Sequence, residues 1–129
     1  EGVMGWKIGS DGFKIVLEAT VPALAEAHLA DDLDAFLTPL GITRLEITQW
    51  VCHTGGPKVI GAFQSALGLE DADLELTRNS LIKVGNLSSA SVLFVLADTL
   101  EVRTPAAGTL GVLMAMGPGF CNEMVLLKW

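Results

Sequence analysis

The pattern of apolar and polar residues divides the first half of the chain into a hairpin, a helix and a buried strand. Two short apolar stretches, residues 6–8 and 13–17, flank the sequence Gly9-Ser10-Asp11-Gly12, which is typical of a hairpin turn. Between residues 20 and 40 the apolar side chains recur at helical spacing, and acidic residues occupy the other face. Residues 47–52 (ITQWVC) then indicate a buried strand.

The second half of the chain is expected to contain further helices before it ends in two strands. One helix is predicted from about Pro57 to Leu67, a short one follows it, and another begins after residues 85–89. This last helix is apolar on nearly every side over residues 92–96, so we expect it to be buried at the centre of the fold. Residues 110–116 and 121–127 complete a mixed sheet covered by helices, which defines an α/β fold.

The composition bounds the size and the surroundings of this fold. The 129 residues fit a single domain, 1–129. Half of the residues are hydrophobic and the mean hydropathy is +0.50. Two interpretations are open: strands buried on both faces, or apolar surface that another domain or subunit covers. No apolar run approaches the ~18 residues of a membrane helix, and the first residues do not form a signal peptide.

Charge and cysteine content narrow the classes of partner. The formal net charge of -7 argues against binding to nucleic acid or to an anionic membrane surface. The two cysteines, Cys52 and Cys121, are too few for a disulfide framework and lack metal-ligand spacing. We therefore expect a cytoplasmic protein without a metal site.

Two polar residues at element junctions are candidates for chemistry. His53 follows the buried strand and precedes Thr54-Gly55-Gly56-Pro57, while Asn86 lies between a glycine and a helix start. Functional side chains of α/β folds are often found at such junctions. The residues alone also allow a structural interpretation, because histidines at strand ends are often packed and asparagine is common in turns. The Gly-Gly-Pro-Lys run lacks the spacing of a phosphate-binding loop, and adjacent strand residues point apart, which disfavours a Cys52–His53 pair.

Three segments together resemble motifs of the type III polyketide synthases, the chalcone and stilbene synthase family. In that family a histidine precedes Pro-Gly-Gly-Pro and an asparagine lies in Gly-Asn-Met-Ser-Ser, which matches His53 and Asn86, 86 − 53 = 33 residues apart. The third segment, residues 111–120 (GVLMAMGPGF), is similar to the family's final strand and Gly-Phe-Gly-Pro-Gly loop. The resemblance covers residues 5–129 and implies the C-terminal half of a thiolase-like fold.

The resemblance implies an acyltransferase with Cys-His-Asn chemistry. In the family a cysteine thiolate attacks an acyl-CoA thioester, malonyl-CoA loses carbon dioxide, and the resulting carbanion condenses with the enzyme-bound acyl group. By matching position, His53 would hold the thiolate and would share with Asn86 the donation of hydrogen bonds to the enolate oxygen. The resemblance implies no metal and no organic cofactor.

The resemblance also implies a substrate cavity with six further residues. They are Ile15, Ser88, Met116, Gly117, Pro118 and Gly119. Residues 114–116 (MAM) stand where the family often has Phe-Gly-Phe, and Ile15 stands where plant members have a phenylalanine gatekeeper. Fewer rings and more flexible aliphatic side chains favour a cavity fitted to an alkyl starter.

The nucleophile of the family is expected to lie outside this chain. The family's cysteine lies far upstream of the histidine, and only 53 − 1 = 52 residues precede His53. We therefore expect a C-terminal half that lacks its N-terminal half and is inactive alone. Its expected partners are acyl-CoA, malonyl-CoA, its own N-terminal half and a second copy in a homodimer. The helix over residues 92–96 is expected to contribute an apolar face to such contacts.

Two other functions are compatible with the sequence. One is a non-catalytic thiolase-like domain that serves as a scaffold or binding partner. The other is half of a ketoacyl-carrier-protein synthase of the third type, which also pairs a histidine with an asparagine. That enzyme usually has asparagine close to the histidine, and residues 54–57 (TGGP) contain none.

Overall fold

The computed structural model describes residues 4–118 and 121–129, without the side chains of Ile15 and Leu17. The strands are β1 (Met4–Gly9), β2 (Gly12–Leu17), β3 (Ile47–Cys52), β4 (Leu110–Gly117) and β5 (Cys121–Lys128). The helices are α1 (Val21–Leu37), α2 (Pro57–Leu67), α3 (Glu75–Val84) and α4 (Ser91–Asp98). Short helical turns are η1 (Thr38–Leu40), η2 (Arg44–Glu46), η3 (Ser88–Ala90) and the π-helical η4 (Thr99–Arg103). No helix among the described residues is long and apolar enough to cross a membrane.

The main sheet has the order β3-β4-β5 and is mixed, as the sequence predicts. Strand β3 runs parallel to β4, and β5 returns antiparallel to β4. The register pairs Trp50 with Val112 and Cys52 with Met114. Because side chains alternate along a strand, these four residues face one side of the sheet. Their neighbour Val51, which pairs with Leu113, faces the other side.

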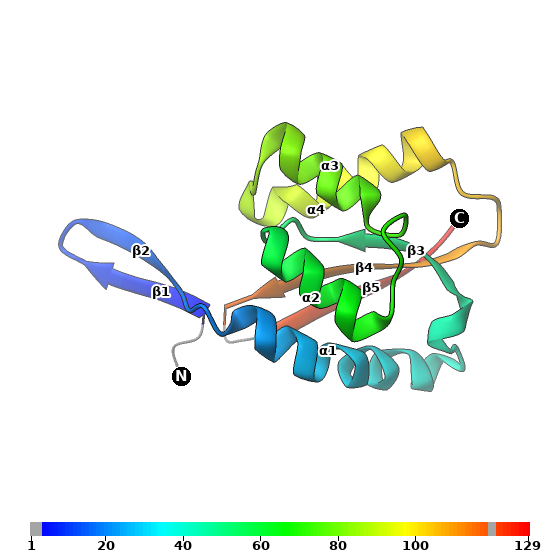
Figure 1. Cartoon of the computed structure of the whole chain (residues 1–129), viewed down its shortest axis with the longest axis horizontal. Coiled ribbons are helices and arrows are strands. Elements are labelled where there is room, and N and C mark those ends of the chain that lie inside the picture. The colour runs from blue at the N-terminus through cyan, green and yellow to red at the C-terminus, as the bar shows by residue number, and fades with distance from the viewer. Residues whose placement is uncertain (1–3, 119–120) are drawn as a thin grey trace.

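Helices α1 and α2 close the first face of the sheet (Figure 1). Helix α1 contributes residues at four-residue spacing, and α2 contributes Ile60 and Phe63. The buried α1 residues are Val21, Ala25, Leu29, Leu33 and Leu37. They form one core with Trp50, Cys52, Val112 and Met114. Helix α2 has the predicted bounds because Pro57 occupies its first turn and Gly68 ends it with a φ of 64°.

Helices α3 and α4 lie on the second face, which is less completely covered. Val92 and Val95 of α4 pack with Val51 and Leu76 in a second, smaller core. On the opposite side of α4, Leu93 is 59% exposed and Phe94 is 47% exposed. The prediction that this apolar helix is buried is therefore wrong for the described chain, because only one side of α4 meets the sheet. The prediction of an exposed apolar face is confirmed.

The predicted hairpin forms, but it is separate from the main sheet. Strands β1 and β2 make a two-stranded sheet that projects away from the body (Figure 1). Its turn requires Gly12, whose φ is 108°, and Lys14 forms an ion pair of 2.5 Å with Asp11. The rings of Trp6 and Phe13 pack edge to face, with centroids 6.4 Å apart, and both remain largely exposed.

Candidate active site

His53 lies immediately beyond β3, where a tight turn connects the strand to α2. Its backbone N–H donates a hydrogen bond of 2.9 Å to the Met114 carbonyl, which extends the pairing of β3 with β4. Gly55 donates to the His53 carbonyl at 3.0 Å. A Cβ on Gly55 would lie 3.1 Å from Val59 Cγ1 and 3.5 Å from His53 Cδ2, and Gly56 has a φ of 131°. The two glycines therefore allow the backbone to turn sharply beside the imidazole.

Asn86 lies in the connection between α3 and α4, where local hydrogen bonds fix its amide. Gly85 has φ 77° and ψ -167°, a backbone conformation that is essentially restricted to glycine. The Ser88 N–H donates to Asn86 Oδ1 at 2.9 Å, and the Leu87 N–H donates to Ser91 Oγ at 2.6 Å. Because Oδ1 is the acceptor for Ser88, the Nδ2 group is the part of the amide that remains for a ligand.

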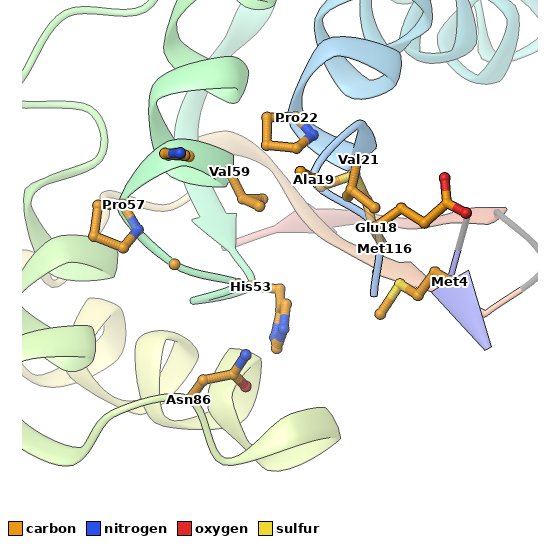
Figure 2. A pocket seen from close by; sticks show the side chains of 13 residues that line it. Met4, Glu18, Ala19, Val21, Pro22, His53, Pro57, Val59, Asn86 and Met116 are labelled. Atoms are coloured by element: carbon orange, nitrogen blue, oxygen red, sulfur yellow. The ribbon is translucent and has the colours of Figure 1, made fainter. Parts of the chain in front are cut away.

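The two side chains converge, although they come from segments 33 residues apart. Figure 2 shows the ring of His53 and the amide of Asn86 pointing toward one another. Both residues line two hollows. The first, which we call the α2 pocket, is about 580 Å³ and also includes Pro57 and Lys58. The second, the hairpin pocket, is about 650 Å³ and also includes Trp6 and Phe13. Met4 and Met116 are shared by both hollows.

Burial sets the protonation preference of His53. The residue is 9% exposed, and desolvation lowers the pKa of its imidazole below the usual value of 6.5. The neutral ring predominates at neutral pH and still carries one N–H donor. Together with the Asn86 amide, it can supply two neutral hydrogen-bond donors to an oxygen that becomes negative.

Neither cysteine is placed to act as a nucleophile in these hollows. Cys52 is fully buried in the core of the first face, and burial strongly raises the pKa of its thiol. Cys121 is partly exposed and lies 3.5 Å from the Pro118 carbonyl oxygen. Within residues 4–118 and 121–129, the linings of both hollows contain no cysteine.

The cavity residues expected from the sequence are mostly found together. Ser88, Met116, Gly117 and Pro118 line the hairpin pocket. Gly119 and the side chain of Ile15 lie outside the described parts of the chain. Met114 points instead into the α1–α2 core and is 2% exposed. Two rings of the hairpin, Trp6 and Phe13, also belong to this lining, so the preference for an alkyl starter stays a prediction.

The lining residues missed in the sequence include Met4, Trp6, Phe13 and Lys58. The exposed aromatics of the hairpin were a usable signal, since exposed rings on a strand often contact a ligand or a partner. In the sequence Lys58 stands out only as the last residue of the Gly-Gly-Pro-Lys run, which lacks the spacing of a phosphate-binding loop. The sequence does not reveal that Met4, the first residue of β1, lies near His53 at the carboxyl end of β3.

The comparisons with known proteins identify the family of the chain. The family model for chalcone and stilbene synthases, C-terminal domain, matches residues 1–129. The chain is 50% identical over its whole length to 1,3,6,8-tetrahydroxynaphthalene synthase of Streptomyces peucetius subsp. caesius, covering 34% of that protein. It is 36% identical over 129 residues to a putative chalcone synthase of Bacillus subtilis (strain 168), covering all of this chain and 35% of that protein.

The comparison with solved structures gives the same family. The crystal structure of 1,3,6,8-tetrahydroxynaphthalene synthase from Streptomyces coelicolor A3(2), a bacterial type III polyketide synthase, superposes with a TM-score of 0.92 at 28% identity. The superposition covers 100% of this chain and 37% of that one. The chain therefore belongs to the chalcone and stilbene synthase family, the type III polyketide synthases, as a C-terminal domain with a thiolase-like fold. It spans about a third of the length of each of these relatives.

Proposed function

We propose that this chain supplies the oxyanion donors of a polyketide-forming acyltransferase that condenses malonyl-CoA with an acyl-CoA starter. The observation that carries the proposal is the convergence of His53 and Asn86 on a shared pair of hollows. The nucleophilic cysteine would come from a preceding domain. Neither Cys52 nor Cys121 takes that role in the proposal, because the first is buried and neither lines the hollows.

The proposed reaction has three steps: acylation of the cysteine, decarboxylation of malonyl-CoA and condensation. The cysteine thiolate attacks the acyl-CoA carbonyl, and CoA leaves as its thiolate. Malonyl-CoA then loses carbon dioxide, and the electron pair of the broken C–C bond forms the enolate of acetyl-CoA. The enolate carbon attacks the acyl-enzyme carbonyl, and the cysteine thiolate leaves. His53 and the Nδ2 group of Asn86 would donate hydrogen bonds to the enolate oxygen, where the negative charge develops.

The environment of His53 is suited to a change of role during this cycle. Burial alone lowers the pKa of the imidazole, which favours the neutral donor. A thiolate brought beside the ring would act in the opposite direction, because an opposite charge favours the imidazolium. In the proposal the histidine therefore stabilises the thiolate before acylation and donates to the enolate after it.

A chimeric enzyme tests the proposal. Residues 1–129 would replace the corresponding third of the Streptomyces peucetius synthase, to which they are 50% identical. We expect the chimera to release CoA from malonyl-CoA and to form condensed products, with 1,3,6,8-tetrahydroxynaphthalene among those monitored. His53→Gln and Asn86→Ala should each lower kcat by roughly 10²–10³-fold, the usual effect of losing one oxyanion donor.

The chain provides matched controls for both substitutions. His28→Gln and Asn79→Ala change an exposed histidine of α1 and an exposed asparagine of α3, and both variants should keep full activity. If the folded chimera turned over equally well without His53 and Asn86, the catalytic assignment would be wrong. A folded chimera that forms its homodimer normally but never condenses malonyl-CoA with an acyl group would favour the scaffold function. Activity with malonyl-carrier protein alone would favour the ketoacyl-synthase alternative.

Two further expectations complete the proposal. The chain alone should form no polyketide from acyl-CoA and malonyl-CoA, which mass spectrometry of the reaction mixture can check. The coding sequence upstream of Glu1 should encode, in frame, a domain with the nucleophilic cysteine. The proposed partners are that domain and a second copy in a homodimer, in the cytoplasm, with no metal or organic cofactor.

A further inference from the structure

Two methionines belong to the wall that the two hollows share. Met4 and Met116 line both the α2 pocket and the hairpin pocket, as His53 and Asn86 do. In Figure 2 the two methionine side chains lie on the side of the pocket away from Asn86. A group that lies against the two hydrogen-bond donors is therefore bordered by thioether sulfur atoms, to which the proposed reaction gives no role.

The other two of the four methionines lie outside both hollows. Met114 precedes Met116 by two residues on β4, but it is 2% exposed and packs inside the α1–α2 core. Met116 is 9% exposed and lies at the end of β4, where that core meets the hollows. Met124 of β5 is half-buried and lines a separate hollow with Phe36 and Asn122. The chain thus contains one methionine that is protected by burial and one that is accessible but remote from the candidate site.

We propose that Met4 and Met116 are sites of reversible oxidation by peroxide, and that their oxidation lowers the affinity of the site for apolar acyl groups. The part that concerns acyl groups rests on the proposed function. A lone pair of the thioether sulfur attacks one oxygen of hydrogen peroxide, the O–O bond breaks, and water leaves after proton transfer. The sulfur is oxidised to the sulfoxide and the peroxide is reduced, so a flexible apolar side chain becomes polar.

The position of the two sulfur atoms determines the consequence of this change. In the hairpin pocket they share the lining with the rings of Trp6 and Phe13. A sulfoxide in this wall has to give up bound water when an alkyl chain covers it, and the alkyl chain offers no hydrogen bond in return. An acetyl group covers less of the wall, and its CoA carrier is the same. Oxidation is therefore expected to weaken the binding of a long acyl thioester and to spare a short one.

The nucleophilic cysteine of the proposed preceding domain is the main alternative target of peroxide, because a thiolate is also oxidised. The two targets differ in what restores them. A thiol reductant restores a sulfenic acid or a disulfide but leaves methionine sulfoxide unchanged. Methionine sulfoxide is reduced by two specific reductases, one for each epimer at sulfur, and these do not restore a sulfinic acid. Repair by the two reductases therefore identifies methionine as the target.

The experiment treats the chimeric enzyme with hydrogen peroxide and then with dithiothreitol. Peptide mass spectrometry should find sulfoxide at Met4 and Met116 and also at the accessible Met124. Met114 should remain a thioether, because it is buried. Calorimetric titration should show roughly tenfold weaker binding of octanoyl-CoA after oxidation and unchanged binding of acetyl-CoA. The two methionine sulfoxide reductases together should restore the affinity for octanoyl-CoA.

Substitutions show which sulfur atoms are responsible. The double variant Met4→Leu/Met116→Leu nearly conserves volume, and it should bind octanoyl-CoA equally well before and after peroxide. Met124→Leu is the matched control and should lose affinity on oxidation as the parent does. Met4→Gln introduces a polar amide in place of the thioether, so it should bind octanoyl-CoA several-fold more weakly without any oxidant.

Binding is measured without condensation, so failure of this inference is distinguishable from failure of the proposed function. Weaker octanoyl-CoA binding that appears only when Met4 and Met116 carry sulfoxide supports the inference, even if no chimera condenses thioesters. The inference is overturned if these two methionines stay unoxidised while Met124 is oxidised. It is also overturned if the double variant loses as much affinity as the parent, or if acetyl-CoA binding falls as far as octanoyl-CoA binding.

Discussion

The two faces of the main sheet are built from similar strands but are covered differently. On the first face, α1 and α2 bury a continuous apolar core that includes Phe63 and Leu33, both fully buried. On the second face, α3 and α4 bury a smaller cluster around Val51, and Phe94 of α4 remains 47% exposed. The first face is thus complete within the described chain, while the second keeps apolar surface that contributes nothing to its stability.

This difference bears on the candidate site, because the site lies where the two faces meet. His53 follows β3, whose side chains alternate between the two cores, and Asn86 precedes α4 on the second face. The histidine is held by pairing with β4 through the Met114 carbonyl. Among the described residues, the asparagine loop is held by local hydrogen bonds. Whatever covers α4 is therefore expected to affect Asn86 more than His53.

The largest expected effect comes from replacing one phenylalanine by alanine on each face of the main sheet and comparing the two losses in the free energy of unfolding. Phe63→Ala removes a fully buried ring and should lower the free energy of unfolding by about 3–5 kcal/mol. Phe94→Ala removes a ring that is already half exposed, so it should cost less than about 1 kcal/mol. Urea denaturation of the chain, followed by circular dichroism, measures both. Equal losses would mean that α4 is covered in solution.

Self-association offers the next test of the open face. The exposed side of α4 should drive the chain to dimerise or to form larger assemblies, because burial of apolar surface contributes roughly 25 cal/mol per Å². Replacing Leu93 and Phe94 by glutamate should weaken association at least about tenfold, since charges in an apolar contact are costly to desolvate.

Light scattering across a dilution series measures this association. Leu45→Glu, at a residue 94% exposed in η2 and remote from α4 in the chain, is the control that should leave it unchanged. A parent chain that stays monomeric at every concentration contradicts the prediction and favours an autonomous domain.

The sequence predicted most elements because their limits are set locally. Strand β3 and helix α2 have the expected bounds, since proline and glycine at the ends of α2 fix where a helix can begin and stop. The burial of α4 within this chain was predicted wrongly. A helix that is apolar on every side is expected to be covered, but its sequence does not say whether the covering surface belongs to the same chain. The convergence of His53 and Asn86 was predicted from their spacing and flanking glycines, which match motifs of the family. The contribution of Met4 depends on how the hairpin meets the body, which no local pattern encodes.

The pH dependence of stability tests the burial of His53 at the junction of the faces. Its folded pKa is lowered by desolvation, so the unfolded state binds the proton more readily. The associated stability is fully present above pH 6.5 and is lost as the pH falls from there through the folded pKa. The slope from this one group is at most about 1.4 kcal/mol per pH unit. His53→Gln should flatten the profile below pH 6.5, which urea denaturation at a series of pH values measures, and an unchanged profile would contradict the lowered pKa of this buried ring.

The smallest expected effect compares two buried threonines in the layer of α3 and α4. Thr77 is fully buried, and its hydroxyl has no hydrogen-bond partner among the described residues. Thr99 is 2% exposed and donates to the Val95 carbonyl at 2.8 Å. Replacement by valine keeps the shape and removes the hydroxyl, so its effect depends on whether the hydroxyl was paired. Thr77→Val should raise the free energy of unfolding by about 1 kcal/mol, and Thr99→Val should lower it by about the same amount. The urea midpoints of the two variants measure both changes in the free energy of unfolding. If Thr77→Val destabilises the protein, water or another part of the protein forms a hydrogen bond with this hydroxyl.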